Sequence, residues 1–149
     1  MAGGTLHATH VLVVDDDYAI REALRLALED EGYVVHEAKD GLEALQVMED
    51  SRYPQVVLLD YRMPRLDGAG VLTRALRREG MLNRNAFILI SANLAILPES
   101  FISILARLDV TVIAKPFDMD DLFDAITRAA RTLMPGNSHN SAAFFDIPD

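Results

Sequence analysis

The chain has 149 residues, half of them hydrophobic, with a formal net charge of −9 and no cysteine. That length and apolar content fit a single domain with a hydrophobic core. The acidic balance argues against direct nucleic-acid binding, since phosphate backbones attract basic surfaces, and the lack of cysteine excludes disulfides and thiolate metal sites.

The sequence contains no apolar run of about eighteen residues or more, so no contact with a membrane is expected from a spanning segment. The N-terminal stretch MAGGTLHATH lacks the basic segment and the following apolar segment of a signal peptide. Together with the missing cysteines, this favours a cytoplasmic protein.

From residue 10 onward, apolar β-branched runs alternate with segments that repeat apolar residues at helical spacing. The predicted elements are strands over 10–14, 33–38, 55–60, 86–91 and 110–117, and helices over 19–32, 40–54, 67–80, 97–109 and 118–135. Alternation with short connections indicates a parallel sheet covered by helices on both faces, which is a doubly wound α/β fold of five strands and five helices.

The predicted elements form one domain over residues 9–134, and residues 1–8 are expected to be a flexible N-terminus. Residues 135–149 are rich in turn-forming residues and then become apolar at Phe144 and Phe145. We expect this segment to be a C-terminal tail or the start of a linker, with a docking segment as the alternative.

Polar side chains stand where four of the predicted strands end. Asp15 and Asp16 follow the first strand, Asp60 ends the third, Ser91 ends the fourth, and Lys115 lies at the end of the fifth. Because ligands bind outside the carboxyl ends of the strands in an open parallel sheet, we expect these side chains to face one crevice.

Three converging carboxylates need a compensating charge, since each pair at ~4 Å would repel by about 4 kcal/mol at an effective dielectric of 20. Either their pKa values rise or a cation lies among them, and a set of oxygen ligands suits Mg²⁺ or Mn²⁺. A lysine and a hydroxyl beside the metal provide an anion site. Together these groups indicate a site for a phosphoryl group, with one aspartate as its acceptor.

Four segments, VLVVDDD, VVLLDYRMPRLDG, LISA and VIAKPF, occur in this order and spacing. With them the chain resembles the receiver domain of bacterial two-component response regulators, over about residues 9–134. The resemblance implies a flavodoxin-like fold with strand order 2-1-3-4-5. It also implies a signalling phosphoacceptor rather than an enzyme, with self-phosphorylation from small donors and autodephosphorylation as its own reactions.

The resemblance implies a role for each carboxylate. Asp60 matches the phosphoacceptor, which receives its phosphoryl group from a sensor histidine kinase or a phosphotransfer protein. Asp15 and Asp16 match the acidic pair that organises Mg²⁺, with Asp60 as a further ligand and the backbone carbonyl of Arg62 completing the set. Mn²⁺ is the alternative ion.

The resemblance implies that the remaining matched residues bind the phosphoryl oxygens. Ser91 and Lys115 match the hydroxyl and the ammonium group of the family, and the backbone N–H of Ala92 assists them. The family also implies a cis bond between Lys115 and Pro116, which an X–Pro bond permits at low energetic cost. Val112, three residues before the lysine, departs from the usual Tyr or Phe, and it cannot swing as an aromatic ring does.

Asp17 differs in role from the two aspartates before it. It immediately precedes the apolar stripe of the first predicted helix, so we predict that it is an N-terminal cap. Asp15 and Asp16 are then the two residues of this run expected to act at the metal site.

The resemblance implies an output surface formed by the helix at 97–109, the strand at 110–117 and the helix at 118–135. Phosphorylation would repack this surface for a downstream protein, or for a fused effector domain absent from this chain, and two copies could dimerise through it.

Two alternatives remain open from the sequence. The first is a receiver-shaped interaction module that is never phosphorylated. The second is a phosphatase similar to the haloacid dehalogenases, with Asp15 as nucleophile and Asp17 as acid/base. Against the second, Tyr18 stands where that family has Thr or Val, and its late acidic motif is missing.

Overall fold

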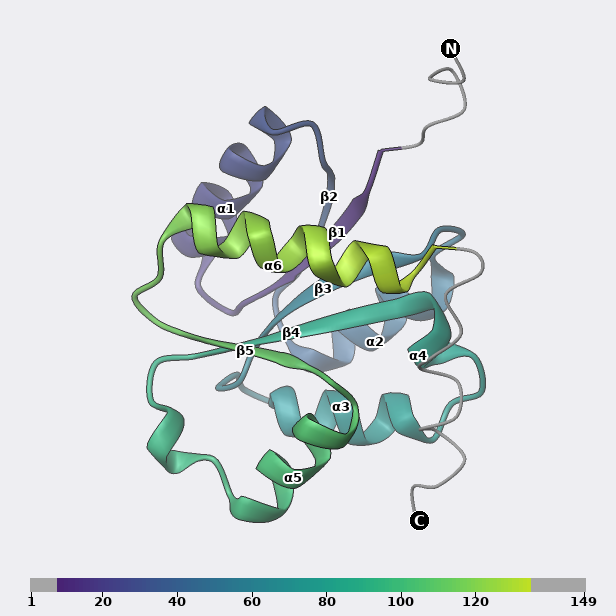
Figure 1. Ribbon diagram of the computed structural model, residues 1–149, viewed down its shortest axis with the longest axis vertical. Coiled ribbons are helices and arrows are strands. Elements are labelled where there is room, and N and C mark those ends of the chain that lie inside the picture. The colour runs from purple at the N-terminus through teal and green to yellow at the C-terminus, as the bar shows by residue number, and fades with distance from the viewer. Residues whose placement is uncertain (1–7, 135–149) are drawn as a thin grey trace.

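The computed structural model describes residues 8–134, and its centre is a five-stranded parallel sheet (Figure 1). Its strand order, β2-β1-β3-β4-β5, is the flavodoxin-like order that the family resemblance implies. The strands are β1 (His10–Val14), β2 (Val34–Ala38), β3 (Gln55–Asp60), β4 (Asn85–Ser91) and β5 (Thr111–Ala114).

Helices cover both faces of the sheet. The long helices are α1 (Tyr18–Asp30), α2 (Gly41–Asp50), α3 (Gly68–Leu76), α5 (Glu99–Arg107) and α6 (Met119–Thr132). Helices α1 and α6 lie on one face, while α2, α3 and α5 lie on the other (Figure 1). The doubly wound α/β prediction is therefore confirmed. Across residues 8–134, every helix is too short or too polar to cross a bilayer.

A sixth helix was not predicted. It is the single turn α4 (Met81–Arg84), which follows Gly80 in the left-handed conformation at φ 78°. The turn buries the side chain of Met81, and the Asn85 side-chain amide donates to the Met81 carbonyl at 2.9 Å. One turn is too short to show an apolar stripe, so sequence periodicity could not reveal it. A 3₁₀ turn, η2 (Leu94–Ile96), follows β4.

Strand residues alternate between the two helical layers. Val11 and Val13 pack toward α1 and α6, whereas Leu12 and Val14 pack toward α2, α3 and α5. The interiors of β1, β3 and β4 are almost wholly apolar, so their polar residues lie at the two ends of the sheet, whereas β2 carries His36 and Glu37 within the strand. At the amino end, His10, Gln55 and Asn85 are neighbours in register.

The loop between β3 and α3 packs tightly against the start of α2. A methyl group at Gly41 would overlap the Leu66 carbonyl oxygen in this loop. Asp40, the N-cap of α2, accepts from the Glu43 backbone N–H at 2.8 Å, and its carboxylate lies 3.7 Å from Nε of Arg65. The loop that follows Asp60 is thereby held against α2.

The structural description does not extend to residues 1–7 or 135–149. Most of the expected flexible N-terminus and the expected tail, with Phe144 and Phe145, lie outside the described residues.

Candidate functional site

Three carboxylates meet at the carboxyl end of the sheet. Asp15 and Asp16 follow β1, and Asp60 is the last residue of the neighbouring strand β3. Each contributes an oxygen atom to a group whose members all lie within 4.8 Å of one another. Asp15 and Asp60 are buried, whereas Asp16 is exposed to solvent. The structure therefore brings together the three acidic residues that the sequence placed at one crevice.

Lys115 approaches this cluster from the loop after β5. Its Nζ atom lies 3.3 Å from Oδ2 of Asp15 and 3.3 Å from Oδ1 of Asp60. The Lys115 backbone N–H donates to the Ser91 carbonyl at 2.9 Å, and the following bond to Pro116 is cis, as the family resemblance implies. One ammonium group thus faces three carboxylates, which leaves an excess of negative charge.

The electrostatics of the cluster shift two pKa values. Burial, together with the nearby charge of Asp15, raises the pKa of Asp60 to about 6, although Lys115 opposes the rise. For Lys115, burial acts to lower the pKa, but attraction to Asp60 and Asp15 outweighs it and the net shift is upward. Asp60 therefore takes up a proton at a higher pH than an ordinary aspartate, as expected for a buried acid beside another acid.

A cavity of about 300 Å³ opens beside Asp60. Its lining includes the three residues expected to bind phosphoryl oxygens, Ser91, Ala92 and Lys115. The Ser91 hydroxyl is engaged within its own loop, since it accepts from the Asn93 N–H at 3.3 Å and donates to the Asn93 carbonyl at 3.2 Å. Carboxylate, hydroxyl and ammonium groups therefore line one space of a size suited to a phosphoryl group.

Arg62, expected to offer its backbone carbonyl, is exposed and lies between two hollows. It lines the cavity beside Asp60, and it also lines a shallower hollow of about 400 Å³ with Asp16, Pro64 and Asp67. This position places the loop that follows β3 next to the acidic cluster.

Arg21 is a site residue that the sequence reasoning missed. Its guanidinium donates to the Asp15 carbonyl at 2.8 Å and to the Glu37 carboxylate at 3.2 Å. Arg21 therefore fixes the backbone where β1 ends. Its position one turn into the helix that follows the acidic pair is the signal that could have found it.

Asp17 does not join the cluster. Its carboxylate caps α1, accepting from the backbone N–H groups of Ala19 at 2.9 Å and Ile20 at 3.3 Å. The prediction of an N-terminal cap is confirmed. Its own N–H donates to Oδ1 of Asp15 at 2.9 Å, which helps to orient that buried carboxylate. A role for Asp17 as acid/base opposite Asp15 is disfavoured by this capping arrangement.

Fold and site together define a class of protein: a doubly wound parallel domain with an acidic crevice and one lysine at the carboxyl end of its sheet. The model of the response regulator receiver domain matches residues 11–127. The chain belongs to this family, so it is a receiver domain of the two-component signalling proteins.

Known relatives agree with this assignment. The chain is 37% identical over 142 residues to the response regulator MprA of Mycobacterium sp. (strain KMS), a match covering 92% of this chain and 58% of that protein. It therefore spans little more than half the length of the curated relatives that it matches.

Solved structures resemble the chain in fold. A CheY-like receiver domain protein from Methanospirillum hungatei JF-1 aligns with a TM-score of 0.73 and 29% identity, over 85% of this chain and 98% of that one. The response regulator TrrA from Thermotoga maritima, solved in complex with Mg²⁺-BeF, aligns with a TM-score of 0.66 and 29% identity, over 81% of this chain and 98% of that one.

Proposed function

We propose that this domain receives a phosphoryl group on Asp60 from a phosphohistidine of a sensor histidine kinase or phosphotransfer protein. The observation that carries the proposal is the position of Asp60. Its buried carboxylate lies beside Asp15 and Asp16, contacts Lys115 at 3.3 Å, and opens onto a cavity with a hydroxyl on its wall.

The transfer moves the phosphoryl group from a histidine nitrogen to a carboxylate oxygen. A carboxylate oxygen of Asp60 attacks the phosphorus, and an O–P bond forms while the P–N bond of the phosphohistidine breaks. The leaving imidazole nitrogen keeps the electron pair of the broken bond and takes a proton from solvent. Lys115 and Ser91 then donate charge-assisted hydrogen bonds to the anionic phosphoryl oxygens, with the Ala92 N–H as a further donor.

The donor set fits a hard divalent cation, since three carboxylates with oxygens within 4.8 Å leave a negative excess beside one lysine. Asp15, Asp16, Asp60 and the Arg62 carbonyl would hold Mg²⁺, with Mn²⁺ as a substitute. When bound, the ion neutralises charge on the phosphoryl oxygens. A relative solved with Mg²⁺-BeF supports the choice of ion.

Phosphorylation then moves the groups that bind the new oxygens. Ser91 gives up its bonds to the Asn93 backbone, and Lys115 turns from Asp15 toward the phosphoryl group. Both residues begin loops that lead into the face formed by α5, β5 and α6. Two charge-assisted hydrogen bonds at about 1.5–3 kcal/mol each approach the roughly 5.5 kcal/mol that a 1:99 to 99:1 shift requires.

The conformational change on this face must occur without the aromatic residue that the family usually has in β5, where this chain has Val112. Val112 is half-buried against the core of the α2, α3 and α5 layer. Tyr61, directly after Asp60, instead contacts the buried Phe101 of α5, with ring centroids 5.7 Å apart. We assign the coupling between the acceptor and α5 to this pair.

The partners follow from the family. We propose a cytoplasmic receiver domain over residues 9–134 that signals to a downstream protein or to a fused effector domain, and that forms homodimers through the α5, β5 and α6 face. A fused effector is supported by the length of the relatives, of which this chain spans 58%.

Intact mass spectrometry after incubation with acetyl phosphate and Mg²⁺ tests the proposal. We expect one phosphoryl adduct that requires Mg²⁺ and is absent from Asp60→Asn. Asp17→Asn, in the same acidic run but engaged as a cap, is the matched control and should still form the adduct.

Other outcomes separate the alternatives. An adduct that persists in Asp60→Asn but is lost in Asp15→Asn would indicate the phosphatase-like reaction. Failure of both acetyl phosphate and a purified sensor kinase to modify the wild type would indicate an interaction module that is not phosphorylated.

A further inference from the structure

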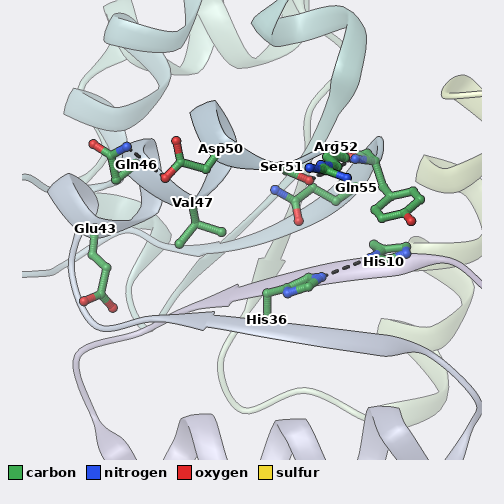
Figure 2. Close-up of a pocket in the computed structure, with 10 residues that line it drawn as sticks. His10, His36, Glu43, Gln46, Val47, Asp50, Ser51, Arg52 and Gln55 are labelled. Carbon is green, nitrogen blue, oxygen red and sulfur yellow. Dashed lines mark hydrogen bonds between the residues drawn. The ribbon is translucent and has the colours of Figure 1, made fainter.

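A second cavity lies at the amino end of the sheet, at the opposite end of the strands from Asp60. It has a volume of about 460 Å³ and lies between α2 and the strands β1, β2 and β3 (Figure 2). Small-molecule sites in proteins commonly occupy about 300–1,000 Å³. The size of this cavity therefore suits a ligand of one or two rings.

Gln55 lines this cavity and lacks hydrogen-bond partners. It is the first residue of β3 and is fully buried, yet neither Oε1 nor Nε2 has a partner in the described structure. Its neighbour in register, Asn85, also has an unpartnered Oδ1, although its Nδ2 donates to the Met81 carbonyl. Buried polar groups are nearly always hydrogen-bonded, so an exception calls for an explanation such as a ligand.

Flat side chains form the sheet side of the cavity. The rings of Tyr53 and His10 stack with centroids 4.4 Å apart, and those of His10 and His36 lie 5.3 Å apart, with interplanar angles of 13° and 11°. A hydrogen bond of 3.0 Å between His10 Nδ1 and His36 Nε2 fixes the two imidazoles (Figure 2). Val47 of α2 stands on the helix side of the cavity (Figure 2). Parallel rings facing an aliphatic side chain provide a slot for a planar ring.

We propose that this cavity binds a neutral planar heterocycle that carries a hydrogen-bond donor next to an acceptor, such as an adenine base. The Gln55 amide presents an acceptor and a donor side by side, the arrangement that pairs with the adenine edge in two hydrogen bonds. In the free protein the amide is fully buried, so it must turn toward the cavity to reach a ligand, and because it makes no hydrogen bonds it can do so without breaking any.

The negative charge at the rim of the cavity disfavours binding of a phosphorylated ligand. Glu43 and Asp50 of α2 and Arg52 line the cavity, so two carboxylates accompany one guanidinium. A free base or a nucleoside meets no electrostatic penalty there, whereas a nucleotide phosphate would be repelled. The site also shares no residue with the cavity beside Asp60, so the proposal does not depend on phosphorylation.

Titration of the ¹⁵N-labelled full chain with adenosine, followed by amide chemical shifts, tests this proposal. We expect saturable shifts centred on His36, Val47 and Gln55, with a Kd of roughly 0.1–1 mM. Adenosine 5′-monophosphate should bind more weakly. Gln55→Leu should raise the Kd for adenosine at least tenfold.

Gln46→Leu is the matched control, because it makes the same substitution on the rim, where the amide already donates to Asp50 at 3.0 Å. It should leave the Kd within twofold of the wild type. The melting temperature of Gln55→Leu should not fall, since the variant removes an unpartnered amide and keeps an apolar side chain of similar size.

Three results would overturn the proposal. They are the absence of saturable shifts at these residues, wild-type affinity in Gln55→Leu, and tighter binding of the monophosphate than of adenosine. A clear fall in the melting temperature of Gln55→Leu would also overturn it, because the amide would then have internal partners.

Discussion

The two ends of the sheet carry polar residues in different states. At the carboxyl end, Asp15 and Asp60 share Lys115 at 3.3 Å, and the Ser91 hydroxyl bonds to its own loop. At the amino end, both amide atoms of Gln55 and one oxygen of Asn85 lack partners among the described residues. Among the described residues, the buried polar atoms without a hydrogen-bond partner therefore belong to the amino end, beside groups there that are paired, such as His10 and His36.

The difference indicates what each end lacks. The carboxyl end has its polar groups paired but carries more negative than positive charge, and the proposed cation and phosphoryl sites rest on that imbalance. At the amino end the charged side chains of Glu43, Asp50 and Arg52 lie at the rim of the cavity. The buried amides of Gln55 and Asn85 are neutral and have atoms without hydrogen-bond partners. Charge imbalance and missing hydrogen bonds are thus separate indications of two kinds of ligand.

After Asp60→Asn, which should abolish phosphorylation, the largest effect should come from Lys115→Met. Removing the ammonium that binds the phosphoryl oxygens should slow phosphorylation by acetyl phosphate roughly 100- to 1,000-fold, by analogy with the loss of one oxyanion donor. Intact mass measured over time gives the rate. Lys39→Met is the matched control, because Lys39 is the only other lysine of the chain and is exposed. Equal phosphorylation rates for the two variants would show that Lys115 takes no part in the reaction.

A pH effect on stability should follow from Asp60. Its pKa of about 6 in the folded protein lies above the ordinary 3.8, so the folded state holds this proton more tightly than the unfolded state does. The resulting stabilisation is fully present below pH 3.8 and is lost as the pH rises through 6. It amounts to about 3 kcal/mol for a shift of about two units.

Urea unfolding of the metal-free protein between pH 4.5 and 7.5 measures this contribution. Asp60→Asn should flatten the profile and should be more stable than the wild type at pH 7.5. Asp16→Asn, at an exposed carboxylate, should retain the slope. An unchanged profile in Asp60→Asn would show that other groups cause the pH dependence.

At the opposite end of the sheet, Gln55→Leu should stabilise the free protein by about 1–2 kcal/mol, since a leucine has no buried polar atoms to leave without partners. Urea unfolding at neutral pH measures the change. Lys115→Met in the same assay should destabilise the metal-free protein, because it leaves two buried carboxylates without their ammonium. If both variants changed the free energy of unfolding in the same direction, the contrast between the two ends of the sheet would be wrong.

The smallest effect concerns two adjacent aspartates. Asp17→Ala should lower the free energy of unfolding by about 1 kcal/mol through loss of the α1 cap, while phosphorylation continues. Asp16→Ala should leave stability nearly unchanged at neutral pH but should weaken Mg²⁺-dependent phosphorylation. Measuring the free energy of unfolding and the phosphorylation rate of both variants separates the cap from the metal site. If Asp17→Ala impaired phosphorylation and Asp16→Ala lowered stability, the roles given to the two residues would be reversed.

Much of the carboxyl end was predictable from the sequence. Strands buried on both faces appear as continuous apolar runs, so a polar residue such as Asp60 or Ser91 marks the point where the strand ends. Topology then brings those ends to one edge. The match to the receiver-domain family over residues 11–127 confirms the fold and the class of protein.

The amino end was not predictable in the same way. Gln55 begins the strand predicted over 55–60 and Asn85 lies just before the strand predicted over 86–91, but in neither case does the sequence show whether the side chain is buried. Whether either amide is buried without partners depends on how α2 packs over β1 and β3, which is a tertiary property. The hydrogen bond from Arg21 to the Asp15 backbone depends likewise on the angle between α1 and β1.

Gly41 takes no part in the chemistry of the site, yet the genetic code and its close packing leave it few tolerated substitutions. Any single-nucleotide change of a glycine codon that alters the amino acid without ending translation introduces a β-carbon, and here that carbon meets the Leu66 carbonyl oxygen. The loop that must yield is the one that follows Asp60 and contains Arg62. In a random mutagenesis screen for signalling, Gly41 should therefore be as intolerant as the acidic residues themselves.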